Sequence, residues 1–303
     1  MAIARLVKKT LKHVGSIKVG AAAGIEAFLD QASKEFLDVT LYSTMLEGLI
    51  VQDTGEENVY LIPAGSKIRI SPDERLYCRW HNGPLDRRDN VLERRYCSVT
   101  ADTKQGYCIK HARTYRALYE RCVSTSGDYS LEACRRVEEK MSIPMGVYIV
   151  DRGLEKFKTG VSRSWRLEDR VSEQPHIVAA IIVRGIGLLE ARETEIKLAQ
   201  NPYIQQLTKR VNPVELIKTS VDKRAPLLAS LVKSLNLKTR PEYLSVHPAD
   251  VNAWMSSSHL KEPWGVYTLY DSWGGYLLLE ADNKYYWTSF RQIQHRNTVE
   301  QLS

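Results

Sequence analysis

Short apolar runs and polar turns alternate over residues 45–77. The runs are separated by the segments DTGEEN, PAGS and SPDE. Apolar runs of this length between clusters of turn-forming residues are typical of strands joined by tight turns. The pattern therefore predicts a small β unit that leads into Cys78.

A mixed pattern covers residues 146–200. The short apolar runs GVYIV and FKTGV precede an amphipathic segment, SWRLEDRVSE, which is followed by the apolar run HIVAAIIV and a second amphipathic segment, LLEARETEIKLAQ. Short continuous runs favour strands, whereas apolar positions three or four residues apart favour helices. The predicted order of elements is β-β-α-β-α.

The flanking segments are less regular. Helical spacing covers residues 112–142, and residues 201–237 predict helices interrupted by prolines. The C-terminal runs VYTLY, GYLLLEA and KYYWTSF, separated by turn residues, predict a β meander. Helix-like spacing also occurs near the N-terminus, at Ile25, Phe28, Leu29 and Phe36.

The composition excludes two classes of protein. With 303 residues, 43% of them hydrophobic and 26% charged, the chain has enough apolar material for ordinary cores and is not expected to be disordered. Its longest apolar runs are far shorter than the roughly 20 residues that span a bilayer. Lysines 8, 9, 12 and 18 interrupt every apolar stretch that would make a signal peptide. We expect no membrane association and a cytoplasmic location.

The charge balance favours an anionic partner. A formal net charge of +7 and a pI near 9.0 suit a polyanion, because cations that neutralise phosphates release condensed counterions. A mildly basic enzyme without nucleic acid has the same balance, so the charge alone does not decide.

The cysteines and histidines suggest a metal site. The segments CRWH and CIKH each place a cysteine and a histidine three residues apart, which gives the four ligands Cys78, His81, Cys108 and His111. Two such pairs can supply the tetrahedral shell of a structural zinc ion, and Cys97 is an alternative ligand that would replace His81. The competing interpretation is a set of unconnected, buried thiols. Nothing nearby requires an open, catalytic position.

Two further features surround this cluster. Cys122 and Cys134 could form a disulfide, but such bonds are uncommon in the cytosol, so free thiols are the expectation. Seven arginines make the segment basic, and Trp80 and Tyr107 lie among them, which would suit phosphates and stacked bases. The arginines are Arg79, Arg87, Arg88, Arg94, Arg95, Arg113 and Arg116.

Residues 146–200 also carry two motifs, GVY at 146–148 and KTG at 158–160, with Tyr148 and Lys158 ten residues apart. This segment resembles the GIY-YIG nuclease superfamily, which pairs two such motifs with a helical arginine and a later glutamate that holds a divalent metal. The resemblance assigns Tyr148, Lys158, Arg170 and Glu195 to the site, with Arg166 and Glu190 as alternatives.

The residue types suit phosphodiester hydrolysis, which needs a group to position water, an arginine on the phosphate and a metal-binding carboxylate. The departure is Lys158, which stands where the superfamily has its second tyrosine. A lysine ammonium holds phosphate well but is a poor base, so weak or absent cleavage is expected. Taken singly, Tyr148 is more typical of a half-buried aromatic residue in a strand. The charged residues Arg166, Arg170, Glu190 and Glu195 are more typical of solvated helix faces.

A longer resemblance covers residues 45–300. The β lead-in, the cysteine knuckle, the string QGYC, the paired strands around VYIV and KTGVSR, and the closing GYLLLE unit are similar to an uncharacterised zinc-binding domain-of-unknown-function family. That family also has a lysine at the second motif and an arginine that matches Arg170. The chain departs from it at His81 and His111, where cysteines are usual.

These observations predict an α+β fold in four parts. They are an N-terminal segment (1–44), a β and zinc-knuckle domain (45–142), a GIY-YIG-like β-β-α-β-α module (143–200), and a C-terminal domain of helices and a β meander (201–303).

Eight aromatic residues crowd the meander and are either core or a stacking face for bases. They are Tyr267, Tyr270, Trp273, Tyr276, Tyr285, Tyr286, Trp287 and Phe290.

The functional expectation is a zinc-containing protein that binds RNA or DNA through a degenerate nuclease-like module. One alternative is a divalent-metal-dependent endonuclease, which would use magnesium. The other is a factor associated with the ribosome or another ribonucleoprotein, without catalysis.

Overall fold

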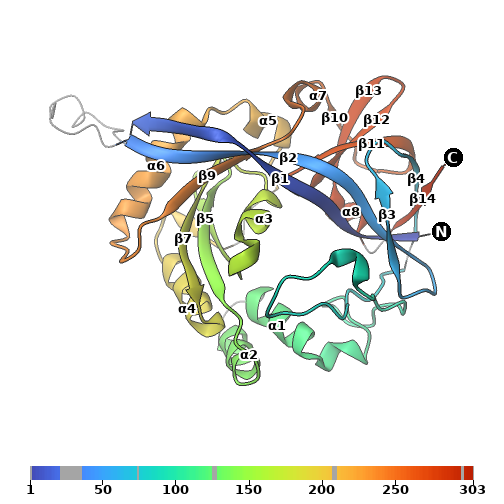
Figure 1. Ribbon diagram of the computed structural model, residues 1–303, viewed down its shortest axis with the longest axis horizontal. Helices are drawn as coiled ribbons and strands as arrows, with labels where there is room; N and C mark the ends of the chain where they lie inside the picture. The colour runs from blue at the N-terminus through green and yellow to red at the C-terminus, as the bar shows by residue number, and fades with distance from the viewer. Residues whose placement is uncertain are drawn as a thin grey trace. The chain divides into compact units, whose positions relative to one another are not determined.

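The computed structural model describes residues 2–20, 36–73, 75–124, 128–206, 210–294 and 297–302. The fold is mixed α/β, with parallel and antiparallel strands and several helices, in agreement with the general α+β class (Figure 1). The chain divides into two compact units that are discontinuous in sequence. Unit 1 comprises residues 1–10, 45–143 and 248–303, and unit 2 comprises residues 11–44 and 144–247.

Unit 1 is built mainly from antiparallel strands. Their order is β10-β13-β12-β11-β4-β14-β1-β2, and β3 pairs with β2; the short pair β10 and β13 is parallel. The strands are β1 (Ala2–Gly20), β2 (Phe36–Asp53), β3 (Val59–Pro63), β4 (Lys67–Pro72), β10 (Ser258–His259), β11 (Gly265–Trp273), β12 (Tyr276–Ala281), β13 (Lys284–Ser289) and β14 (Asn297–Gln301). Residues 2–10 of β1 and 45–53 of β2 belong to this unit.

The helices of unit 1 are short. They are η2 (Val91–Glu93), η3 (His111–Arg113), α1 (Tyr115–Ser124), α2 (Asp128–Glu138), α7 (Val251–Met255) and α8 (Phe290–Ile293). The core of the unit is formed by alternate residues of the strands, among them Leu49, Ile62, Ile68, Leu279 and Val299, each fully or almost fully buried. The β unit expected over 45–77 and the C-terminal meander are both part of this sheet.

Cys122 in α1 and Cys134 in α2 form a disulfide, so the expectation of free thiols was wrong. The two helices pack against each other and bring the Cα atoms of these residues to 4.9 Å, within the usual range for a disulfide. Both residues are completely buried.

Unit 2 contains a sheet in the order β2-β9-β7-β5-β6-β8. Its elements are β5 (Met145–Asp151), β6 (Phe157–Arg163), η4 (Ser164–Arg166), α3 (Leu167–Ser172), β7 (Val178–Ile186), α4 (Leu188–Leu198), β8 (Ile204–Gln205), α5 (Pro213–Ile217), α6 (Val221–Ser234) and β9 (Glu242–His247). The order β5-β6-α3-β7-α4 is the β-β-α-β-α order predicted for residues 146–200. Strand β8 lies within residues 201–237, where helices were expected, and β9 lies between that segment and the predicted meander, where no element was predicted.

Strand β5 is the centre of unit 2. It pairs antiparallel with β6 on one side and with β7 on the other, and every one of its residues is buried. Helices α3 and α4 contact β5 and β6. Asp151, at the end of β5, pairs with Arg224 of α6 at 2.7 Å and is buried, so this ion pair attaches α6 to the sheet.

The N-terminal residues form two long strands rather than a helix where they are described. Of the positions with helix-like spacing, Ile25, Phe28 and Leu29 lie outside the described residues, and Phe36 begins β2. Among the described residues, no helix has both the length and the apolar character needed to cross a bilayer.

Candidate functional site

Four potential metal ligands converge in unit 1. Cys78, Cys97, Cys108 and His111 are all buried, and one ligand atom from each lies within 4.8 Å of all the others. The Cys108 Sγ is 3.3 Å from the His111 Nδ1 and 4.0 Å from the Cys97 Sγ, and the Cys78 Sγ is 3.7 Å from the His111 Nδ1. The cluster could hold a metal ion.

These distances fit a tetrahedral ion. Metal–ligand bonds of about 2.0–2.3 Å at tetrahedral angles place neighbouring ligand atoms roughly 3.5–3.8 Å apart. The separations of 3.3 to 4.0 Å fall around that value without rearrangement of the backbone. The donor set is therefore already arranged for one ion.

Backbone pairing assembles the cluster from three loops. The Cys78 N–H donates to the Val99 carbonyl at 2.9 Å, and the Cys97 N–H donates to the Trp80 carbonyl at 3.0 Å. The His111 N–H donates to the Cys108 carbonyl at 3.0 Å, which closes the turn between those two ligands. Residues distant in sequence are thereby fixed around one point.

A buried arginine supports the cluster from β1. The Arg5 guanidinium donates to the carbonyl oxygens of Cys78 and Cys97 at 2.9 and 2.8 Å, and also to the Gln52 side chain. The Gln52 amide in turn donates to the Tyr96 carbonyl at 3.0 Å. Burial lowers the pKa of Arg5 to about 10, so it remains a cation at neutral pH. Arg5 therefore fixes the backbone of two ligand residues.

Burial changes the protonation equilibria of the ligand residues. Burial raises the pKa of the Cys78 thiol to about 12 and also raises the pKa of the Cys97 thiol, although backbone N–H groups donate to both sulfurs. Burial lowers the pKa of His111, which keeps its imidazole neutral, and the ring stacks on Trp80 at 4.1 Å. Since thiolates are the metal-binding form, a cation is what would stabilise them here.

His81 is not part of this cluster. It forms an isolated β-bridge with Tyr96, its ring packs against the Tyr96 ring at 5.0 Å, and its Nδ1 accepts a hydrogen bond from the Gly83 N–H. The structure thus brings together the alternative ligand set, with Cys97 in place of His81.

The basic residues around the cluster have different environments. Arg94 is bound to Asp89 at 2.6 Å, and the buried Arg116 donates to the Gly83 carbonyl. Tyr107 is buried beneath the cluster, and Trp80 has one ring face on His111. The remaining five arginines are exposed, namely Arg79, Arg87, Arg88, Arg95 and Arg113.

In unit 2, Tyr148 is buried at the centre of a second candidate site. It pairs in register with Gly160, and a Cβ at that glycine would meet the Tyr148 hydroxyl and ring. The Gln174 side chain donates to the Tyr148 hydroxyl at 2.7 Å, and the Lys158 Nζ lies over the ring, 5.7 Å from its centroid. The glycine of the second motif therefore makes room for the tyrosine of the first.

Lys158 and Arg170 provide positive charge beside Tyr148. Burial lowers the pKa of Lys158, with Arg170 and Arg152 contributing and Tyr148 and Glu195 opposing. The nearby Tyr148 oxygen is the largest cause that raises the pKa of Arg170, and the Glu173 carboxylate adds to it. The Arg170 side chain is 45% exposed and binds Glu173 at 2.9 Å, so it forms the solvent side of the site.

Glu195 is already paired. It forms an ion pair with Arg192 one turn earlier on α4, and the two side chains are only 6% and 3% exposed. Burial raises the pKa of Glu195, while Arg192, Lys158 and Arg170 oppose that shift. Electrostatic interactions therefore connect Tyr148, Lys158, Arg170 and Glu195 with one another.

The two alternative site residues, Glu190 and Arg166, have different environments. Glu190 is exposed on α4, and Arg166 is bound to Glu173 with its side chain 34% exposed. Sequence reasoning missed Arg192 and Gln174, as well as Arg5 and Gln52 at the metal cluster. The spacing of Arg192 and Glu195 on one helix was a usable signal, whereas Arg5 and Gln52 are brought in by strand pairing alone.

The C-terminal aromatic residues are mostly core. Trp273, Tyr276, Trp287 and Phe290 are buried. Tyr267 packs edge-on against Tyr286, Tyr270 packs against Tyr285, and these four rings are half-buried. The interpretation as a continuous stacking face therefore applies at most to the half-buried rings.

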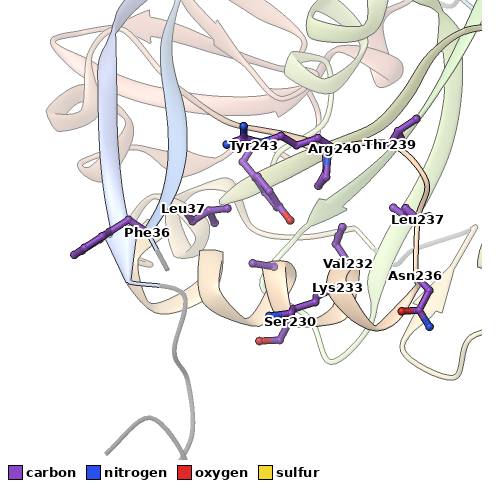
Figure 2. A pocket seen from close by; sticks show the side chains of 12 residues that line it. Phe36, Leu37, Ser230, Val232, Lys233, Asn236, Leu237, Thr239, Arg240 and Tyr243 are labelled. Atoms are coloured by element: carbon purple, nitrogen blue, oxygen red, sulfur yellow. The ribbon is translucent and has the colours of Figure 1, made fainter. Parts of the chain in front are cut away.

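Unit 2 also contains a pocket of about 710 Å³ that no sequence motif indicated. It lies between the start of β2, the end of α6 and the following loop, and Figure 2 shows Tyr243 directed toward α6. Burial raises the pKa of Tyr243 to about 12. Lys233 and Arg240 are exposed at the pocket edge.

No family model, no curated protein and no solved structure matches the chain.

Proposed function

We propose that this protein binds nucleic acid through a GIY-YIG-like module in unit 2 that no longer performs metal-dependent cleavage. The same proposal assigns zinc, in a structural role, to the cluster of unit 1. The observation that carries it is the buried pair of Arg192 and Glu195 beside Lys158 and Arg170.

The charges of the unit 2 site suit a phosphate rather than a divalent cation. The carboxylates of Glu195 and Glu173 are outnumbered by the cations Lys158, Arg170 and Arg192. A magnesium ion at Glu195 would have to displace a buried arginine and would meet two further cations. A phosphodiester would instead add the missing negative charge and accept hydrogen bonds from Arg170 and Lys158.

The side chains at the positions that the nuclease superfamily uses for catalysis suit phosphate binding better than cleavage. Tyr148 is 1% exposed and its hydroxyl already accepts a hydrogen bond from Gln174, so it is not directed at solvent water. Lys158 takes the place that the superfamily gives to a second tyrosine and supplies charge instead of a base. One carboxylate oxygen of Glu195 is held by the buried Arg192. Tyr148 and Glu195 are thus each engaged by a neighbouring side chain, and Lys158 is a cation in place of a base.

Zinc is the ion that the unit 1 donor set favours. Three thiolates and one imidazole are soft and borderline ligands, which select zinc over magnesium or calcium. All four ligands are buried, which is typical of a closed structural site without a coordinated water.

The test is the salt dependence of nucleic-acid binding. Lys158→Ala and Arg170→Ala should each weaken binding and reduce the slope of log K against log salt by about one counterion term. Lys238→Ala, which removes an exposed cation of the same unit, is the control and should leave the slope unchanged. Wild-type affinity and slope in both site variants would refute the proposal.

Sequencing of the nucleic acid that co-purifies with the protein would identify RNA or DNA, including any ribosomal species. The same nucleic acid should stay intact with magnesium. Magnesium-dependent cleavage that Glu195→Ala abolishes would replace this proposal with the endonuclease alternative.

A further inference from the structure

The turn between two metal ligands exposes an apolar side chain. Ile109, between Cys108 and His111, is 70% exposed, the highest value for a large hydrophobic side chain among the described residues. Isolated exposed hydrophobic residues are common on protein surfaces. The position of this one is informative because of its rigid support and its charged neighbours.

The turn of residues 108–111, hereafter the knuckle turn, is held at both ends. The Cys108 N–H donates to the Cys78 Sγ at 3.3 Å, and the N–H groups of His111 and Ala112 donate to the Cys108 carbonyl at 3.0 Å. The His111 ring is fixed by its stack on Trp80. The backbone on both sides of Ile109 is thus fixed, so little backbone entropy is lost when a partner contacts its side chain.

Exposed cations surround the knuckle turn. Arg79 lies against the backbone of Gly106 and donates to the Gln105 carbonyl at 3.3 Å, which holds its guanidinium over the adjacent loop. Lys110 and Arg113 are exposed on either side of His111, and Lys104 is exposed on the loop before Cys108. The acidic residues near the turn include Glu57, which acts on His111, Glu120, which acts on Tyr107, and the exposed Asp102. Cations therefore exceed anions around Ile109.

The aromatic residues near the knuckle turn are less exposed than Ile109, among them Tyr115 at 45%. Tyr107 is 2% exposed, and Trp80 has one ring face against His111. The exposed apolar contact of the knuckle turn is therefore aliphatic.

We propose that the knuckle turn is a contact site for single-stranded nucleic acid, in which Ile109 packs on the face of an unpaired base while Lys110, Arg113 and Arg79 hold the adjoining phosphates. An apolar tip flanked by cations matches the alternation of base and phosphate along a single strand. In a duplex the base faces are already stacked, so Ile109 would gain a contact only after costly unstacking. The inference rests on the proposed function for its partner class and adds a preference for unpaired bases.

The experiment compares a labelled oligouridylate, an oligothymidylate and a blunt duplex of the same length as probes of the full-length, metal-loaded protein. Ile109→Ser should lower affinity for the single strands about three- to tenfold, leave the salt slope unchanged and leave duplex binding unchanged. Lys110→Ala should instead reduce the salt slope. Val251→Ser removes another exposed aliphatic side chain of unit 1 and is the matched control.

The outcomes separate the two proposals. Single-strand binding by Ile109→Ser at the wild-type level, or an equal loss for the duplex, overturns the knuckle-turn proposal. If Arg170→Ala binds normally while Ile109→Ser loses single-strand affinity, the unit 2 site fails and the knuckle turn stands. The Ile109→Ser variant should contain as much metal as the wild type, because Ile109 supplies no ligand. If the variant lost its metal, a weaker affinity would be explained by disruption of the cluster and would contradict a direct contact of Ile109.

Discussion

Arg192 and Glu195 form an ion pair on one turn of α4 with both side chains almost completely buried. Removing one partner of such a pair leaves an uncompensated charge in a low-dielectric environment. Glu195→Ala is therefore expected to lower the free energy of unfolding by about 3–5 kcal/mol.

Chemical denaturation measures this change, with Glu193→Ala on the exposed face of the same helix as the control. The control should change stability by about 0.5 kcal/mol or less. If Glu195→Ala were as stable as the control, Glu195 would be free to bind a metal and the metal-free interpretation of the site would fail.

The ligand set of the metal cluster gives a second prediction. Cys97→Ser should lose the metal because Cys97 is one of the four convergent ligands, whereas His81→Ala should retain it. Elemental analysis of the purified proteins measures both, with one ion per chain expected in the wild type. Metal loss in His81→Ala combined with retention in Cys97→Ser would restore the ligand set first read from the sequence.

The presence of Cys97 in place of His81 in the ligand set shows what local spacing could not predict. Spacing along the chain favoured His81, because CRWH and CIKH have the same form. The bridge between His81 and Tyr96 is a pairing of distant residues, and it places Cys97 beside Trp80 and so within the cluster. Local spacing cannot reveal such a pairing.

The elements of the fold also differ in how far the local sequence predicts them. Residues 145–198 followed the prediction because each run is short, strongly patterned and bounded by turns. Strand β1 escaped prediction, since cations and apolar residues are intermixed along 19 residues, and much of its second half is exposed. Strand β9 is short and lies beyond the helical segment of residues 201–237, where the sequence pattern predicted no element. Its place is set by parallel pairing with β2, which the sequence does not encode locally.

The third prediction concerns the packing of Gly160 against Tyr148. An alanine Cβ there would meet the hydroxyl and ring of Tyr148, which is buried, so the tyrosine would have to shift within a packed core. Gly160→Ala should therefore cost about 1–3 kcal/mol of stability and displace Tyr148. Thermal unfolding and the fluorescence of the protein report both. Gly20→Ala is the control, because nothing lies within 4 Å of its Cβ position; equal stability of the two variants would contradict the packing argument.

The fourth prediction concerns the stability that the disulfide between Cys122 and Cys134 adds. The disulfide closes a loop with a sequence separation of 12, and a crosslink of that size stabilises a fold by about 2–4 kcal/mol. A reductant should lower the melting temperature of the wild type and leave that of the double variant Cys122→Ser, Cys134→Ser unchanged. An unchanged melting temperature of the wild type, with mass spectrometry showing full reduction, would show that the crosslink adds no stability.

From the lowered pKa of Lys158 we expect nucleic-acid binding to depend on pH. Burial lowers its pKa from the ordinary value of 10.5, so the folded protein loses this proton at a lower pH than the unfolded chain does. Between the lowered pKa and 10.5 the unfolded chain binds more protons, and stability therefore rises with pH in that window. Phosphate binding changes in the opposite direction, because the site loses one cation as the pH rises.

The measurement is the salt slope of binding from neutral pH to just below 10.5. The wild-type slope should fall by about one counterion term, while Lys158→Arg should keep its slope because a guanidinium remains protonated throughout. Lys238→Ala, which removes an exposed lysine of the same unit, should decline like the wild type. An equal decline in Lys158→Arg and the wild type would show that another group titrates and that Lys158 does not contact the phosphate.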